Sequence, residues 1–216
     1  ETVGPFEADA DGCPTCRAKR LPWERAVRLG SHEGVLREAV LDLKFRAWRK
    51  IGDDLGRRLG QAVQRDLTRA GIAAERVVVV PVPTTTLRRL GHGVDHALVL
   101  ARAVARELGA PVRRPVRRRR GPAQRGASAT ERRKRVARAF RPRRGWVVSR
   151  IPAGSVVVVV DDVRTTGATL RAVCRAVRIV GRSSGGRRSA GGAGLRLWVA
   201  TVGVTPSPTA RRGSVS

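Results

Sequence analysis

The sequence predicts an α/β fold in which a mostly parallel sheet is flanked by helices, and three observations lead to this expectation. Two short runs, at 76–83 and 156–160, are continuously apolar and β-branched, as expected of strands buried on both faces of a parallel sheet. A stretch with helical spacing follows each run. A strand, a loop and a helix in this order form half of a βαβ unit, whose strands are parallel.

Helices are expected on both sides of the first strand. In residues 31–48 the apolar positions 35, 36, 39, 40 and 43 fall on one helical face. A second amphipathic run opens at Asp53 and extends to Leu67, and Gly71 stands where a C-cap glycine is typical. Residues 95–108 return to helical spacing after the strand and end at Gly109.

The second strand is also followed by a helix, with apolar residues at 170, 173, 174 and 177. Because Cys174 lies on this face, we predict that it is a core residue without a chemical role. Residues 195–204 predict a last strand. We expect the Arg-rich segment 111–144 to be mobile or extended, the low-complexity segment 181–194 to be a flexible loop, and the tail 205–216 to be disordered.

The net charge of +28 comes from 45 basic residues, of which only four are lysines. Arginine clusters neutralise phosphates, so this charge suits a polyanion partner; a GC-rich genome would produce the same excess of Arg. With 3% aromatic residues, nucleic-acid binding would depend on the phosphate backbone and not on base stacking. The sequence contains no apolar run long enough for a membrane span and no signal peptide, so we expect a cytoplasmic protein.

Cys13 and Cys16 form a Cys-x-x-Cys pair, which is half of a tetrahedral zinc site and fits a reducing compartment. His32 is the nearest further candidate ligand, with no spacing to support it. The chain begins at Glu1 and contains no Met, so we expect an incomplete amino end whose missing part holds the other ligands. We therefore divide the chain into a truncated zinc-binding-like segment at 1–30, an α/β domain at 31–204 and the tail.

The stretch VVVVVDDVRTTGATL at 156–170 indicates a ligand site, because parallel sheets bind ligands beyond the carboxyl ends of their strands. We expect residues 163–169 to turn the chain into the next helix, and Gly167 to let backbone amides approach a ligand. These amides, the positive end of the helix and three hydroxyls predict a monophosphate cradle; the hydroxyls are those of Thr165, Thr166 and Thr169. Asp161 and Asp162 would repel a phosphate, but as hydrogen-bond acceptors they suit a ribose diol. The motif therefore predicts a ribose 5-phosphate.

The same stretch resembles the 5-phosphoribosyl 1-pyrophosphate (PRPP) motif of type I phosphoribosyltransferases. Over 13–178 the chain resembles the ComF family of competence-associated, phosphoribosyltransferase-like proteins, through CPTC, LKFRAWRK, VVPVP with LRRLGHG, ALVLARAVARELG and QRGASATERRKRV in that order. The chain departs from the family at 92–96, where HGVDH replaces Arg-Gly-Phe-Asn-Gln, and at Arg135, where Asn is usual.

The resemblance implies a type I phosphoribosyltransferase fold with a remnant amino-terminal zinc-finger-like segment. It implies that Asp161 and Asp162 act in catalysis, and that PRPP binds with Mg²⁺ held by its pyrophosphate and ribose oxygens. The implied ligand-binding residues are Asp161, Asp162, Arg164, Thr165, Thr166, Gly167, Ala168 and Thr169, together with Arg88 and Arg89 of a pyrophosphate loop.

Several residues keep a second interpretation. Arg88 and Arg89 are equally consistent with solvated charge, and the segment 113–135 with a hood over substrate or a tether for nucleic acid. His92 and His96 have the i, i+4 spacing of a metal pair, but flanking glycines favour surface histidines. An apolar strand ending in two acids also resembles a Walker B element, which we reject because no Gly-Lys dipeptide of a P-loop is present.

Two functions remain open. In the first, the protein is a glycosyltransferase in which a nitrogen base displaces pyrophosphate from C1 of PRPP. In the second, it is a non-catalytic factor in competence and DNA uptake that binds single-stranded DNA and a helicase partner.

Overall fold

The computed structural model of the chain describes residues 20–45, 49–84, 95–119, 136, 138–143, 151–184 and 195–205. In this part of the chain the central layer is a sheet whose strands lie in the spatial order β1 (Arg25–Ser31), β6 (Arg196–Val204), β5 (Val156–Arg164) and β2 (Val77–Pro81). Every neighbouring pair of these strands is parallel. The predicted α/β fold with a mostly parallel sheet is therefore confirmed.

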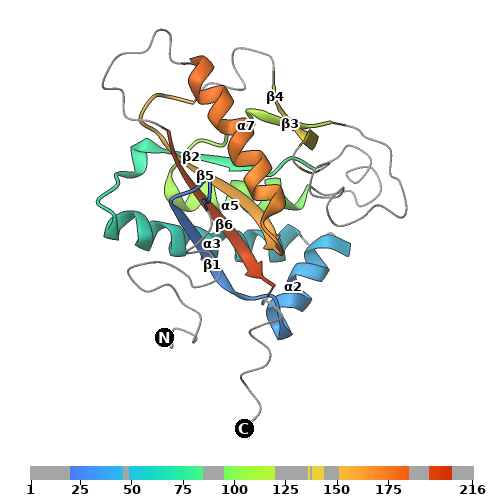
Figure 1. Ribbon diagram of the computed structural model, residues 1–216. Helices are drawn as coiled ribbons and strands as arrows, with labels where there is room; N and C mark the ends of the chain where they lie inside the picture. Colours follow the sequence, from blue (N-terminus) through green and yellow to red (C-terminus); the bar gives the residue numbers. More distant parts are fainter. Residues whose placement is uncertain are drawn as a thin grey trace.

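Helices cover both faces of the sheet (Figure 1). One face is covered by α2 (Gly34–Phe45), α3 (Arg49–Arg69) and α5 (His96–Leu108), and the 3-10 turn η1 (Ala74–Arg76) leads into β2. The other face is covered by α7 (Ala168–Ser184) and by an antiparallel pair, β3 (Val116–Arg118) and β4 (Phe140–Pro142). The helices predicted at 31–48, 53–67, 95–108 and 170–177 are all present.

The five consecutive valines of β5 are explained by the layers that pack on both faces of the sheet. Val156, Val158 and Val160 pack toward α3 and α5, whereas Val157 and Val159 pack toward α7. All five are at most 2% exposed. Burying a Val side chain contributes about 1.5 kcal/mol or more to stability, so β5 is a major anchor of the sheet and fixes the position of the residues that follow.

Helices α3 and α5 pack at close range because glycines occupy one face of α3. Gly52, Gly56 and Gly60 are spaced four residues apart, which places them on one side of the helix. A Cβ added at Gly56 would lie 2.5 Å from the Cβ of Ala103 and 2.9 Å from the carbonyl oxygen of Leu100. The sequence pattern alone did not reveal this contact, because glycine in a helix carries no apolar signal.

Strand β1 was not predicted. Its side chains are mostly exposed or half-buried, and among them only Val27 is buried, so the strand lacks the apolar run of β2 and β5. It is an edge strand that pairs with β6, and Arg25 places its guanidinium 5.4 Å from the ring centroid of Trp198. Residues 25–31 therefore lie in the same sheet as the predicted ligand site.

Other boundaries also differ from the predictions. Helix α3 begins at Arg49, four residues before Asp53, and α7 extends to Ser184 into the segment predicted as a loop. Within 111–144, the described strands β3 and β4 are extended and bury Val116 and Phe140. The tail from 206 lies outside the described residues, as does most of the predicted hood at 113–135. In the described part of the chain, no helix has the length and apolar character required to cross a membrane.

Candidate functional site

The candidate site lies at the carboxyl end of β5. Strand β5 extends through the acid pair to Arg164, with Asp161 opposite Thr201 and Val163 opposite Gly203 on β6. The turn was predicted to begin at residue 163, and this was wrong because residues 163 and 164 continue the ladder with β6. The backbone of Asp161 and Asp162 is consequently held by strand pairing rather than by a loop, which fixes both carboxyl groups more firmly than expected.

The turn after β5 is short. Thr165 and Thr166 are exposed, and α7 begins at Ala168. Gly167 has a φ of +69°, in the left-handed region that favours glycine, and a Cβ there would lie 3.5 Å from the Trp23 side chain. The hydroxyl of Thr166 accepts a hydrogen bond from the amide of Ala168 at 3.4 Å. The hydroxyl-bearing residues Thr165 and Thr166 thus lie at the surface directly before the amino end of α7, where the cradle was predicted.

The guanidinium of Arg171 supports this turn from the first turns of α7. The Nη2 atom of Arg171 donates a hydrogen bond to the carbonyl oxygen of Thr166 at 2.5 Å. The backbone amide of Arg171 donates a hydrogen bond to the carbonyl oxygen of Gly167. A cation therefore stands beside the amino end of α7, where the helix dipole also favours an anion.

Asp162 forms an ion pair that the sequence analysis missed. The Nζ of Lys44, in the last turn of α2, lies 2.8 Å from Oδ2 of Asp162. The other carboxylate oxygen, Oδ1, accepts a hydrogen bond from the backbone amide of Val163 at 2.6 Å. Both carboxylate oxygens of Asp162 are thus held, and the side chain is only 14% exposed.

Asp161 has a different environment. Its Oδ1 accepts a hydrogen bond from the backbone amide of Asp162 at 3.0 Å. Burial, followed by the charge of Asp162, raises the pKa of Asp161 to about 8, although that hydrogen bond, Lys44 and Arg118 act in the opposite direction. At neutral pH Asp161 is therefore mostly protonated.

His32 lies at the same edge of the sheet, directly after β1. Its backbone amide donates to Val204 at 2.9 Å, and its Cβ lies 3.1 Å from the position of a Cβ added at Gly203. Burial lowers the pKa of His32, and the positive charges of Lys44 and Arg37 lower it further against the opposing charge of Asp162. His32 is therefore neutral at neutral pH, and Nδ1 is buried without a hydrogen-bond partner in the described structure.

Several predicted residues lie outside the described part of the chain. These are Cys13, Cys16, Arg88, Arg89, His92 and Arg135. Within the described residues, no group of three or more His, Cys, Asp or Glu side chains is arranged to hold a metal ion. The zinc site and the pyrophosphate loop therefore remain predictions.

Two further predictions can be compared with the structure. Cys174 is fully buried, and burial raises the pKa of its thiol to about 12, which confirms its place in the core. Asp95, within the unusual HGVDH sequence, caps α5: its Oδ1 accepts from the amide of Leu98 at 3.3 Å and from the hydroxyl of Thr84 at 3.1 Å. Asp95 stands where the family has Asn, and both residue types cap helices well, so this substitution retains a helix cap at this position.

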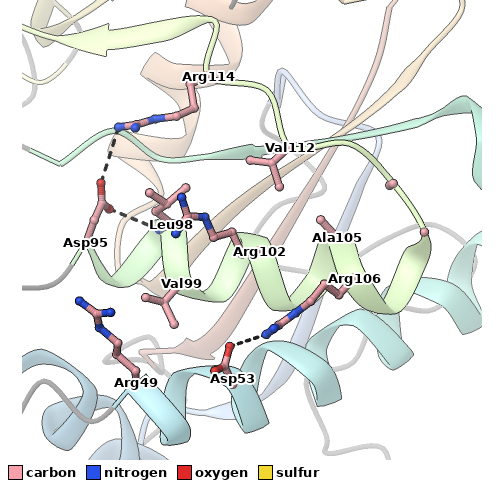
Figure 2. Close-up of a pocket in the computed structure, with 12 residues that line it drawn as sticks. Arg49, Asp53, Asp95, Leu98, Val99, Arg102, Ala105, Arg106, Val112 and Arg114 are labelled. Atoms are coloured by element: carbon pink, nitrogen blue, oxygen red, sulfur yellow. Dashed lines mark hydrogen bonds and ion pairs between the residues drawn. The ribbon is translucent and has the colours of Figure 1, made fainter.

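A separate cavity of about 860 Å³ runs along α5 (Figure 2). Its walls carry four arginines, namely Arg49, Arg102, Arg106 and Arg114, around an apolar floor that includes Leu98, Val99 and Val112. Two of the arginines form ion pairs, Arg106 with Asp53 and Arg114 with Asp95. The cavity contains no residue of the acid pair or of the turn after β5, so we treat it as a second, basic groove.

The acid pair, the hydroxyl-bearing turn and the amino end of α7, all at the carboxyl edge of a parallel sheet, define a phosphoribosyltransferase-type domain. A family model described as "Phosphoribosyl transferase domain" matches residues 93–184, which include α5, β5 and α7. Competence protein F of Haemophilus influenzae is 30% identical over 176 residues, which is 80% of this chain and 74% of that protein. The chain therefore belongs to the ComF family, as its sequence motifs predicted.

Proposed function

We propose that this protein binds PRPP at the acid pair and the turn after β5, and transfers its phosphoribosyl group to a nitrogen base. The observation that carries the proposal is the pair of adjacent carboxyl groups at the end of β5, beside the exposed hydroxyls of Thr165 and Thr166 and the first amides of α7. A ribose diol and a 5-phosphate are separated by a few bonds, so one ligand can reach both features.

Each group has a role in this proposal. Asp162 accepts a hydrogen bond from one ribose hydroxyl, and Asp161, when protonated, can donate to or accept from the other. The 5-phosphate lies against the turn, where the amides of α7, the threonine hydroxyls and the helix dipole favour an anion. The reaction forms a bond from the base nitrogen to C1 and breaks the bond from C1 to the pyrophosphate oxygen, which keeps the electron pair. The base nitrogen then loses its proton.

Mg²⁺ fits this site as a companion of PRPP rather than as a resident metal. The described residues provide no cluster of three ligands, and Lys44 already neutralises Asp162, so the ligand's own pyrophosphate and ribose oxygens would hold the ion. When bound there, Mg²⁺ neutralises charge on the pyrophosphate leaving group.

The substitution Asp162→Asn tests the site. It keeps the size of the side chain but replaces one acceptor oxygen by a donor, and removes a charge-assisted hydrogen bond of about 1.5 to 3 kcal/mol. We expect calorimetric titration with PRPP and Mg²⁺ to show roughly tenfold weaker binding or more. Asp54→Asn is the matched control, because Asp54 on α3 has a 65% exposed side chain that pairs with Arg57, and its replacement should leave binding unchanged. Equal affinity of Asp162→Asn and wild type would contradict the assignment.

Binding must then be separated from catalysis. Wild type and Asp162→Asn are offered a panel of purine, pyrimidine and pyridine bases while pyrophosphate release is measured. Release that depends on one base and is lost in the variant supports a transferase. Tight PRPP binding without release on any base favours a protein that uses the site only for binding.

A second candidate function rests on the basic groove. Its four arginines come from α3, α5 and the segment after α5, and two of them pair with aspartates of the same groove (Figure 2). In a chain of net charge +28, such a groove would suit the phosphate backbone of single-stranded DNA. The name of the H. influenzae relative refers to competence, which fits a role in DNA uptake beside a helicase partner. We expect weak binding without sequence preference that falls steeply as salt rises, and further weakening in Arg102→Ala combined with Arg106→Ala. Affinity that does not change between low and moderate salt would indicate that the charge is compositional.

A further inference from the structure

Lys44 reaches the acid pair from a separate element of the fold. It lies in the last turn of α2, one residue before the helix ends, while Asp162 lies on β5. Two fully buried side chains, Val40 and Leu43, hold α2 in the same core cluster as Val160. The backbone position of Lys44 is therefore fixed by packing, and its 2.8 Å contact with Asp162 is a feature of the fold rather than of a freely moving surface side chain.

The surroundings of the acid pair are asymmetric. Asp162 has a cation at hydrogen-bond distance, whereas the polar contact that the structure gives Asp161 is the backbone amide of Asp162. The other charged or titratable groups that act on this cluster come from different elements: His32 after β1, Arg37 on α2 and Arg118 on β3. His32 is neutral and Arg118 acts on Asp161, whereas Lys44 lies at hydrogen-bond distance from Asp162 and so distinguishes one acid from the other. Two adjacent carboxyl groups with little solvent cannot both ionise without a large cost in free energy, so such a distinction decides which of them is charged.

We propose that Lys44 is a positioning residue of the ligand site: its ion pair with Asp162 neutralises the charge of that side chain and fixes the orientation of its carboxylate. The role that this gives to the ribose diol rests on the proposed function. Lys44 acts through Asp162 and carries out no step of the reaction itself. A further consequence is that the net charge of the pair and Lys44 together is close to zero, which suits an anionic ligand.

Removing the lysine charge should change how the site responds to pH. Lys44 lies 2.8 Å from the Asp162 carboxylate and also lowers the pKa of Asp161, so its loss makes the acid pair as a whole easier to protonate. In Lys44→Met we expect PRPP to bind roughly tenfold more weakly at neutral pH, and the loss of binding on acidification to begin at a higher pH than in wild type. Lys44→Arg keeps the charge and should recover most of the affinity. Lys50→Met removes the same charge from an exposed position in the first turn of α3 and is the control.

A double-mutant cycle shows whether Lys44 acts through Asp162. We expect Lys44→Met to weaken PRPP in the wild-type background and to have little further effect in the Asp162→Asn background. An equal effect in both backgrounds would overturn the proposal, since Lys44 would then contact the ligand independently of Asp162. A change in melting temperature alone, with PRPP affinity and its pH profile as in wild type, would also overturn it and leave Lys44 a purely structural role.

One measurement needs no ligand and separates this inference from the proposed function. Carbon-13 NMR of the aspartate carboxyl groups in the free protein should show the acid pair titrating at higher pH in Lys44→Met than in wild type, because Lys44 lowers the pKa of Asp161 and contacts Asp162. If wild type fails to bind PRPP, the proposed function fails, but this titration still tests Lys44. An unchanged titration of the pair would refute the inference. If Lys44→Met does not fold, Lys44→Gln replaces it, since Gln keeps a hydrogen-bond donor without the charge.

Discussion

Replacing Asp161 by Asn should make the stability of the protein less sensitive to pH. In the folded chain the pKa of Asp161 is raised to about 8 from its ordinary value of 3.8, first by burial and then by Asp162. Between these two values the folded state keeps a proton on Asp161 that the unfolded chain releases. The folded state therefore binds more protons, and the free energy of unfolding falls as pH rises through this window.

The size of this effect follows from the pKa difference. Each pH unit inside the window changes the free energy of unfolding by about 1.4 kcal/mol for one proton, so Asp161 contributes a fall of roughly 2 to 3 kcal/mol between pH 5 and pH 7. Above about pH 8 both states are ionised and the contribution becomes constant. Asn at 161 resembles the protonated acid in size and has no charge to titrate. Asp161→Asn should therefore lack this fall and become more stable relative to wild type as pH rises.

Urea denaturation of wild type and Asp161→Asn, at half-unit steps from pH 5 to pH 8, measures the difference directly. Comparing the two proteins at each pH cancels the titration of the groups that do not interact with Asp161. Asp54→Asn serves again as the control, because it changes the same residue type at an exposed position. A constant difference between Asp161→Asn and wild type over the whole range would show that Asp161 does not carry the proton, and the proposed asymmetry of the acid pair would lose its basis.

Two further predictions concern the rest of the chain. Gly56→Ala should lower the free energy of unfolding by about 1 to 2 kcal/mol, because overpacking against Ala103 and the Leu100 carbonyl outweighs the better helix propensity of Ala. The control is Gly181→Ala on α7, where the nearest atom to an added Cβ is the end of the Leu195 side chain at 3.2 Å. Equal melting temperatures for the two variants would contradict the packing argument. Protein that carries a second Cys-x-x-Cys pair before Cys13 should contain one zinc ion per chain, since four thiolates complete a tetrahedral site, and metal analysis that finds no zinc would refute this.

The sequence predicted those helices and strands whose buried residues form a continuous or periodic apolar pattern. The valines of β5 and the faces of α5 and α7 are of this kind. Strand β1 was missed because an edge strand buries little, and the guanidinium of Arg25, rather than an apolar side chain, lies over the ring of the buried Trp198. The contact between the glycine face of α3 and α5 was missed for a related reason. Glycines let two helices approach closely but add no apolar side chains to the sequence pattern.

The candidate site was predicted where its residues are contiguous and missed where the fold brings distant residues together. Asp161, Asp162 and the turn to Gly167 lie within seven positions of one another, and the structure places them at one edge of the sheet. Lys44 is more than a hundred residues away in sequence, and no local pattern links it to Asp162. The available signal was its rarity: it is one of four lysines among 45 basic residues, and it stands on the apolar helix that the sequence did predict.

The asymmetry of the acid pair also answers a difficulty raised by the sequence. Two ionised carboxylates beside a phosphate cradle would repel the phosphate and the pyrophosphate of the ligand. In the structure, burial keeps a proton on Asp161 at neutral pH, and Lys44 neutralises Asp162 at 2.8 Å. The pair therefore offers hydrogen-bond acceptors to a ribose diol with almost no net charge, while Arg171 and the amino end of α7 remain positive beside the turn. A site that accepts hydrogen bonds from hydroxyl groups at one point and attracts an anion nearby is suited to a sugar phosphate. The proton on Asp161 and the charge of Lys44 make this possible, because they remove the repulsion between two carboxylates and a phosphate that the sequence alone implied.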